Sequence, residues 1–172
     1  ILFSYTMKIS KKIIANLKSS GVNFFLSVPC KLLANMITLL ENDREIYYSA
    51  VPREEEGMGI CAGAFLSNKF PCILMQNTGI GNSVNAIVSL LQLYQIPIVL
   101  LISYRGTPGE TVGAQSGMAK ATKDILQTLK IPILHCDDEN DLTRISNFVN
   151  HAKVIEGPVS ILCNFDLMKE DV

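Results

Sequence analysis

Residues 71–103, PCILMQNTGIGNSVNAIVSLLQLYQIPIVLLIS, decide the fold. The stretch begins with the apolar segment Pro71–Met75 and ends with a second one, Ile96–Ser103. Neither segment alternates between apolar and polar residues, which is typical of strands that are buried on both faces. The residues between them, 83–94, favour a buried helix. A strand, a helix and a strand in this order predict two parallel strands joined by a crossover helix.

The rest of the chain repeats this alternation. Ile9, Ile13 and Leu17 recur at helical spacing, and Gly21 is placed to end their helix. We predict a three-layer α/β/α fold with a mainly parallel sheet of about six strands. The domain is expected to span residues 7–172, with 1–6 as a start-site extension. The other strands are expected at 22–28, 45–51, 131–136 and 159–164, and the other helices at 31–41, 53–67, 118–129 and 139–152.

Composition excludes several classes of function. The 172 residues carry 15 Lys and Arg against 16 Asp and Glu, a formal net charge of -1, so there is no basic excess for binding nucleic acid. Hydrophobic residues make up 48% and charged residues 18%, which argues against disorder and predicts extensive burial in a core or against partner chains. No apolar run approaches the roughly 20 residues that span a bilayer.

The cysteines do not form a metal-binding pattern. They are Cys30, Cys61, Cys72, Cys136 and Cys163, and no two of them are spaced as Cys-x-x-Cys. A zinc site is therefore not expected. An odd number of cysteines scattered through apolar segments is typical of reduced, buried thiols in a cytoplasmic protein.

Three acids follow the predicted strand 45–51 directly, as Glu54, Glu55 and Glu56. Acids at a helix N-terminus are favoured by the helix dipole, which is one explanation. The other is that one of them points into the crevice beyond the strand ends, where parallel sheets bind ligands and where burial raises the pKa of a carboxyl group. The same helix carries Gly57, Gly59 and Gly63. Each costs roughly 1 kcal/mol in a helix interior, so we expect a packing reason for all three.

Two further loops follow predicted strands. Residues 76–82, Gln-Asn-Thr-Gly-Ile-Gly-Asn, could cradle an anion at a helix start or form a tight turn. A dinucleotide fingerprint would need glycine at Val84, so a nicotinamide site is not expected. The second loop, 104–117, contains Arg105. This arginine is either a solvated surface charge or a bidentate clamp for a carboxylate, sulfonate or phosphonate, with Gln115 downstream in the same loop.

These motifs together resemble a known family. Residues 28–33, 53–57 and 75–85 are similar to the pyrimidine-binding domain of thiamine diphosphate-dependent decarboxylases. With residues 103–106 and 113–115, the resemblance narrows to the alpha subunits of sulfopyruvate decarboxylases, and phosphonopyruvate decarboxylases are near relatives. It extends from Met7 to about Asp166, nearly the whole chain.

The resemblance implies roles for the site residues. A glutamate of this domain binds the aminopyrimidine ring of the cofactor and assists its activation. Counting nine residues back from Gly63 identifies Glu54, whereas alignment on Glu-x-Gly identifies Glu55, and we favour Glu54. Where relatives carry paired histidines, this chain has Tyr104 and Arg105. The resemblance assigns the cofactor to Glu54, Gly79, Gly81 and Asn82, and the substrate to Tyr104, Arg105 and Gln115.

Two departures from the family pattern bear on function. Many relatives carry an acid in the first loop, where this chain has Cys30 and Lys31. The chain also lacks the Gly-Asp-Gly motif of the domain that holds Mg²⁺ and diphosphate. The resemblance therefore implies no metal site here and a partner beta subunit that carries this domain, in a hetero-oligomer.

The implied reaction converts 3-sulfopyruvate to sulfoacetaldehyde and CO₂ in coenzyme M biosynthesis. One alternative is phosphonopyruvate decarboxylation by the same kind of subunit. The other, from a different class, is a non-catalytic scaffold or regulatory subunit that has kept the fold.

Overall fold

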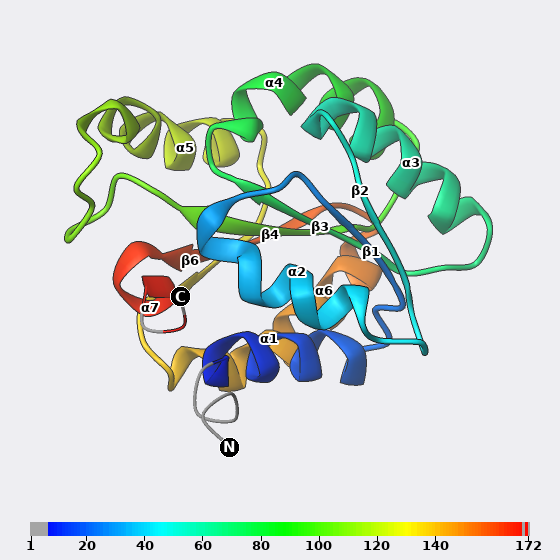
Figure 1. Cartoon of the computed structure of the whole chain (residues 1–172). Helices are drawn as coiled ribbons and strands as arrows, with labels where there is room; N and C mark the ends of the chain where they lie inside the picture. The colour runs from blue at the N-terminus through cyan, green and yellow to red at the C-terminus, as the bar shows by residue number, and fades with distance from the viewer. Residues whose placement is uncertain (1–6, 170, 172) are drawn as a thin grey trace.

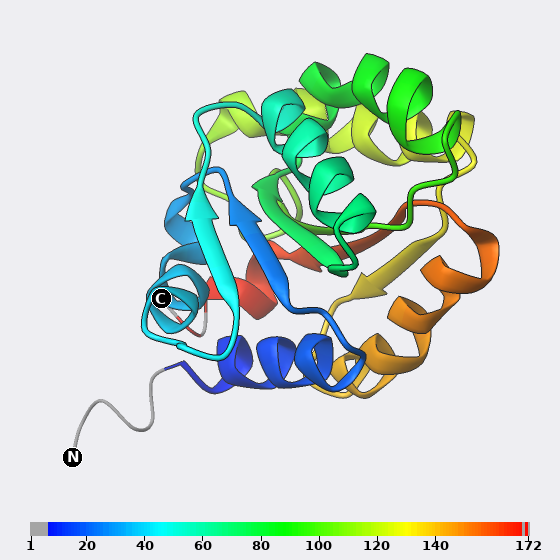
Figure 2. The same ribbon diagram turned by 90° about the vertical axis from the view of Figure 1, so that its right-hand side faces the viewer.

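A parallel sheet forms the centre of the molecule. The computed structural model describes residues 7–169 and 171, so the expected extension 1–6 lies outside the described residues. The described residues form six strands in the order β2-β1-β3-β4-β6-β5, and every neighbouring pair is parallel (Figure 2). The strands are β1 (Phe24–Ser27), β2 (Tyr47–Ala50), β3 (Pro71–Gln76), β4 (Val99–Tyr104), β5 (Ile133–Cys136) and β6 (Val159–Asn164).

Helices cover both faces of this sheet, which confirms the predicted three-layer arrangement (Figure 1). One face carries α1 (Lys8–Ser19), α2 (Ala34–Glu41) and α6 (Ile145–Ile155). The other carries α3 (Glu54–Leu66), α4 (Gly79–Ala86) and α5 (Ser116–Thr128). A short helix, α7 (Phe165–Lys169), follows β6 and was not predicted from the sequence.

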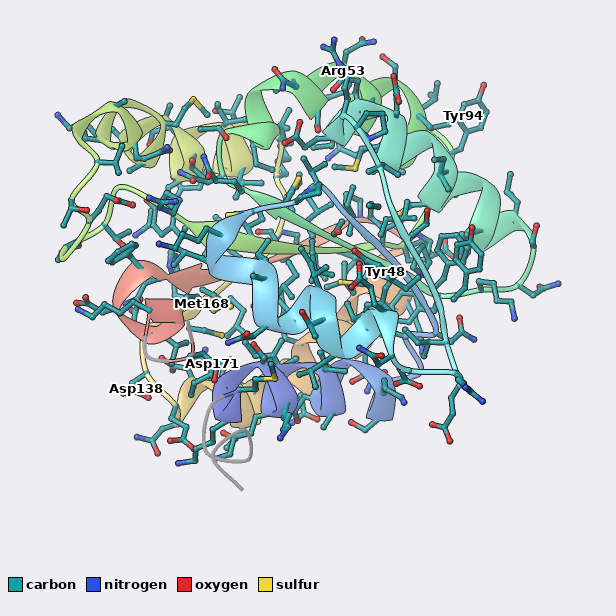
Figure 3. All side chains as sticks on the ribbon, in the orientation of Figure 1. Tyr48, Arg53, Tyr94, Asp138, Met168 and Asp171 are labelled. Atoms are coloured by element: carbon teal, nitrogen blue, oxygen red, sulfur yellow. The ribbon has the colours of Figure 1, made fainter. Side chains whose placement is uncertain are left out.

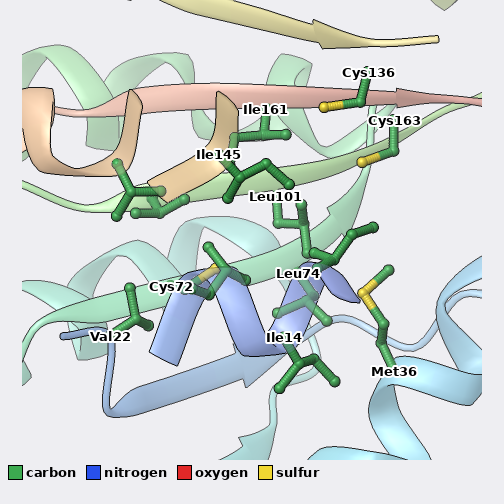
Figure 4. Packing of buried hydrophobic residues seen from close by; sticks show 14 of the residues in the cluster. Ile14, Val22, Met36, Cys72, Leu74, Leu101, Cys136, Ile145, Ile161 and Cys163 are labelled. Carbon is green, nitrogen blue, oxygen red and sulfur yellow. The ribbon is translucent and has the colours of Figure 1, made fainter. Parts of the chain in front are cut away.

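The central strands are apolar throughout because each face of the sheet has its own core. Cys72, Leu74 and Leu101 pack against α1, α2 and α6, as Figure 4 shows. The intervening residues Ile73 and Leu100 pack against α3, α4 and α5. All of these side chains are fully buried, and each large one contributes roughly 1.5–3 kcal/mol of transfer free energy. The side chains along β3 and β4 are thus buried in the two cores.

The segment after β3 differs from the predicted loop 76–82. Helix α4 begins at Gly79, inside that loop, and continues into a π-helical turn at Ile87–Gln92. Glycine disfavours helix, which is why the sequence indicated a loop. Ile80, in the first turn of α4, is fully buried in the core on this face of the sheet, and its burial offsets the glycine cost. Helix α5 likewise begins at Ser116, two residues inside the predicted loop 104–117.

The glycines of α3 have different environments. Gly57 packs closely on the sheet, since a Cβ there would lie 2.4 Å from Ile73 Cδ1 and 3.2 Å from Val51 Cγ2. Gly59 and Gly63 lie on the exposed side of the helix, and a Cβ at either would meet nothing within 4 Å. The expected packing reason is therefore confirmed for Gly57 and was wrong for the other two within the described chain.

The first helix receives its N-cap from the far end of the chain. Asp171 is buried, and its Oδ1 and Oδ2 accept hydrogen bonds from Ile9 N at 3.0 Å and Ser10 N at 2.8 Å. The residue that precedes α1, Met7, has a left-handed conformation with φ 82° and caps nothing with its side chain. Figure 3 shows Asp171 between α7 and α1. The last turn of the chain and the first helix therefore stabilise one another.

Replacing Asp171 by alanine tests this cap. Asp171→Ala leaves two backbone N–H groups of α1 without acceptors, so we expect the free energy of unfolding to fall by about 1–2 kcal/mol. Asp124→Ala, at an exposed position within α5, is the matched control and should change it by less than about 0.5 kcal/mol. Urea titrations of both variants measure the difference. Equal losses in the two variants would contradict the assigned cap.

Candidate active site

Polar side chains from three separate segments meet at the carboxyl edge of the sheet. Cys30, in the loop after β1, places its Sγ 3.5 Å from Ser103 Oγ on β4 and 3.8 Å from Gln76 Oε1 at the end of β3. Gln76 Nε2 donates to Thr78 Oγ1 at 2.9 Å and to Gln115 Oε1 at 3.0 Å. This network links the first loop to the long loop after β4. Parallel sheets bind their ligands at this edge.

Glu54 is the first residue of α3 and points at the start of α4. Its side chain is largely buried, at 9% exposure, and its Oε2 accepts a hydrogen bond from Asn82 Nδ2 at 3.3 Å. A Cβ at Gly79 would lie 2.3 Å from Glu54 Cγ, so only glycine leaves room for the carboxylate. The structure therefore brings three of the predicted cofactor residues together. Gly81 stands apart, because a Cβ there would meet only Met118 Cε at 3.8 Å.

Glu55, the alternative acid, has one satisfied and one unsatisfied oxygen. Its Oε1 accepts a hydrogen bond from Arg53 at 2.6 Å. Its Oε2 is buried, and no described residue donates to it. Burying a charged oxygen without a donor is costly, so this atom marks a place where an additional donor would fit. Glu56 is exposed, and the acids also lie where the helix dipole favours them.

Arg105 is neither a solvated surface charge nor an unoccupied clamp. Its Nε and Nη2 bind the two carboxylate oxygens of Glu110, with Nη2 2.9 Å from Oε1, and its guanidinium lies 5.5 Å from the centre of the Phe165 ring. The Arg105 side chain is 13% exposed and that of Glu110 only 4%. The guanidinium lowers the pKa of Glu110 to about 2. The sequence prediction missed Glu110, although a carboxylate five residues after the arginine was the available signal.

The backbone at Arg105 is held by an amide that the sequence analysis did not single out. Asn77, fully buried, accepts a hydrogen bond from Arg105 N at 3.1 Å and donates one to Arg105 O at 3.2 Å. Beyond this point Gly106 has φ 78°, and a Cβ there would lie 2.4 Å from Gln115 O. The loop therefore folds back onto its own end, and glycine is required where it does so.

Tyr104 does not join this cluster. Its side chain is buried, and its hydroxyl donates to Ala119 O on α5 at 2.7 Å. Burial raises the pKa of this hydroxyl. Its predicted contact with substrate stays untested, whereas Gln115 lies within the network described above.

Comparison with known proteins identifies the family. No family model matches the chain. It is 39% identical over 157 residues to the sulfopyruvate decarboxylase subunit alpha of Methanococcus maripaludis, which covers 91% of this chain and 94% of that protein. It is 47% identical over 147 residues to the protein of the same name from Methanocaldococcus jannaschii, covering 85% and 87%. The chain belongs to the sulfopyruvate decarboxylase alpha-subunit family.

This membership confirms the resemblance inferred from the motifs, and longer relatives add a further fact. A sulfopyruvate decarboxylase from Methanosarcina acetivorans is 36% identical over 149 residues, which cover 86% of this chain but only 38% of that protein. Phosphonopyruvate decarboxylases from Streptomyces match more weakly, at 35–36% identity over about two thirds of the chain. An alpha-subunit sequence thus also occurs as part of a larger protein.

Across residues 7–169 and 171, the structure contains no helix with the length and apolar character needed to cross a bilayer. In the same residues, no three His, Cys, Asp or Glu side chains are grouped so as to hold a metal ion.

The fit of Glu54 against Gly79 can be tested without any ligand. A methyl group at position 79 would overlap the Glu54 side chain, which is flexible and is expected to move away from Asn82. Gly79→Ala should therefore shift the side-chain amide resonance of Asn82 in a ¹H–¹⁵N NMR spectrum of a folded protein. Gly81→Ala is the matched control and should leave the resonance in place while gaining about 0.4–1 kcal/mol of stability. An unchanged resonance in Gly79→Ala would contradict the contact.

The Arg105–Glu110 pair predicts a pH dependence of stability. Because the folded-state pKa of Glu110 is about 2 rather than its usual 4.5, the pair stabilises the fold fully above about pH 4.5 and loses this effect as pH falls through about 2. At neutral pH we expect Glu110→Gln to lower the free energy of unfolding by about 2 kcal/mol. The difference from the unmodified protein should shrink as pH falls below about 4.5 and vanish below about pH 2, as measured by urea titrations at a series of pH values. A difference that does not change between neutral and low pH would contradict the assigned pairing.

Proposed function

We propose that this chain is the alpha subunit of a thiamine diphosphate-dependent decarboxylase that converts 3-sulfopyruvate to sulfoacetaldehyde and CO₂, a step of coenzyme M biosynthesis. One observation carries the proposal. A nearly buried carboxylate, Glu54, sits against Gly79 at the ligand-binding edge of a parallel sheet, in a chain 39–47% identical to sulfopyruvate decarboxylase alpha subunits.

The residues at this edge fit the aminopyrimidine part of thiamine diphosphate. Asn82 donates a hydrogen bond to Glu54 Oε2, which leaves Oε1 to accept a hydrogen bond from a ring nitrogen. Glu54 would hold the ring and carry the proton at that atom, and Gly79 gives its side chain room. When bound, the cofactor serves as the electron sink that takes up the electron pair released with CO₂. The buried, unpartnered Oε2 of Glu55 is the observation in favour of the alternative acid.

The substrate's second anion distinguishes sulfopyruvate from simple 2-oxo acids. We place it on the Arg105 side of the site, where Gln115 and Cys30 also lie. Phosphonopyruvate would present a similar anion, and the weaker match to phosphonopyruvate decarboxylases keeps it as the second candidate substrate. A scaffold subunit without chemistry is disfavoured because it would have no use for a glycine that accommodates the Glu54 carboxylate.

An exposed apolar surface beside the site supports a partner subunit. On α3, Gly59 and Gly63 leave the helix backbone open, and Ile60 between them is 45% exposed. Leu93 and Tyr94, which follow the π-helical turn, are also exposed, and Figure 3 shows Tyr94 directed outward. We call these five residues the α3 surface. Partner chains commonly cover exposed apolar side chains, and helix glycines allow close approach of another backbone.

We propose that the beta subunit covers the α3 surface and supplies the diphosphate and Mg²⁺ sites. The names of the relatives, subunit alpha, support a partner chain, and the larger Methanosarcina protein has room for a second domain. We expect the complex to be cytoplasmic, because all five cysteines are free in the structure.

Two variants separate the candidate acids. Glu54→Gln keeps the size of the side chain but removes the carboxylate, so turnover of the alpha–beta complex with sulfopyruvate should fall by at least about a hundredfold. In the Glu55→Gln variant, turnover should fall by less than about tenfold, since the Glu55 carboxylate already forms an ion pair with Arg53. The reverse order would assign the role to Glu55. Full activity in both variants would refute the role of this motif.

Assembly can be tested at Ile60. The chain alone should show no decarboxylation with thiamine diphosphate and Mg²⁺, and full turnover by it would refute the split site. Ile60→Glu should weaken binding of the beta subunit by at least about tenfold, because it places a charge in the apolar contact. Val154→Glu is the matched control, since Val154 is 78% exposed on α6, across the sheet. Isothermal titration calorimetry compares the two, and equal affinities would place the interface elsewhere.

A further inference from the structure

A cavity of about 290 Å³ lies beside the Arg105–Glu110 pair. It opens between the loop that follows β1, the loop that follows β4, and α7. Its charged lining residues are Lys31, Arg105, Glu110 and Lys169, and Leu32 and Val112 add apolar wall. Three cations and one carboxylate around one cavity favour an anionic ligand.

The charges of these cations are not equally available. Arg105 is neutralised by Glu110, which binds its Nε and Nη2 and leaves Nη1 free of that contact. Lys169 pairs with Asp166. Lys31 makes no ion pair with any residue of 7–169 and 171. Lys31 is therefore the lining cation whose charge no carboxylate of the described residues offsets.

Lys31 is also next in sequence to a residue of the candidate active site. It is the first residue of the 3-10 turn Lys31–Leu33 and follows Cys30, whose thiol contacts Ser103 and Gln76 in the candidate active site. Cys30 also lies close enough to the guanidinium of Arg105 to influence its pKa. The cavity thus adjoins the polar network at the strand ends through Cys30 and Arg105.

We propose that Lys31 binds the sulfonate of 3-sulfopyruvate in this cavity, with Arg105 Nη1 as a second donor, and that the Arg105–Glu110 pair forms a neutral, preorganised wall. This inference rests on the proposed function. It follows from charge: a sulfonate placed on the Nε–Nη2 edge of Arg105 would meet the Glu110 carboxylate, whereas one placed at Lys31 meets an uncompensated ammonium.

The chemistry predicts which kinetic constant Lys31 affects. The sulfonate keeps its charge from substrate to product, whereas the carboxylate leaves as CO₂. A contact with the sulfonate therefore stabilises bound substrate and transition state equally, and its loss raises KM without lowering kcat. Pyruvate has no second anion, so Lys31 should not affect its turnover.

The test uses the alpha–beta complex with Lys31→Gln. KM for sulfopyruvate should rise at least about tenfold, as expected for loss of a charge-assisted hydrogen bond, with kcat and any pyruvate turnover unchanged. Lys31→Arg should keep most of the affinity for sulfopyruvate because it keeps the positive charge. Lys11→Gln is the matched control: it removes an exposed lysine that lines a different groove, beside α1 and α2, and should behave as the unmodified complex.

Binding of an unreactive analogue makes the result independent of catalysis. Calorimetry with 3-sulfopropanoate and with propanoate should show a preference for the sulfonate that Lys31→Gln reduces at least about tenfold. Unchanged binding and KM in Lys31→Gln would overturn the inference, as would equal losses with pyruvate or propanoate. A complex that binds 3-sulfopropanoate through Lys31 but decarboxylates no 2-oxo acid would refute the proposed function and leave the anion site standing.

Discussion

Burial on both faces of β3 and β4 is the constraint on which the rest of the structure depends. Every side chain of β4, Val99–Tyr104, is buried. In β3 every side chain except that of the last residue, Gln76, is buried. Strands packed in this way offer no free side chain along their length for binding or catalysis. Polar groups accumulate where the strands end, and parallel pairing brings those ends to one edge. The packing of these strands therefore places the candidate site at the carboxyl edge of the sheet.

The fold was predictable because this constraint is visible in the sequence, as unbroken apolar segments separated by helical periodicity. The start of α4 was not, because glycine propensity points to a loop and only tertiary burial of Ile80 reverses it. The positions of Glu54, Gly79 and Asn82 were predicted from motifs, and the structure brings them together. The Arg105–Glu110 pair was missed, because a loop has no periodicity to indicate which of its residues meet.

Gly59 and Gly63 show where the interpretation of the sequence was wrong. Their cost in a helix indicates a close neighbour, and we expected this neighbour within the chain. The structure instead leaves both glycines open beside the exposed Ile60. In the assembly proposed above, the partner subunit would supply the close neighbour that the chain itself does not provide.

The cap on α1 has a consequence for the order of folding. Asp171 is separated from Ile9 by 162 positions, so a ribosome adds it long after the first helix has emerged. Throughout that interval two N–H groups at the start of α1 have no carboxylate to accept from them, and an isolated helix of 12 residues is marginal in water. The cap on α1 can therefore form only after Asp171 has left the ribosome, long after the helix itself has been made.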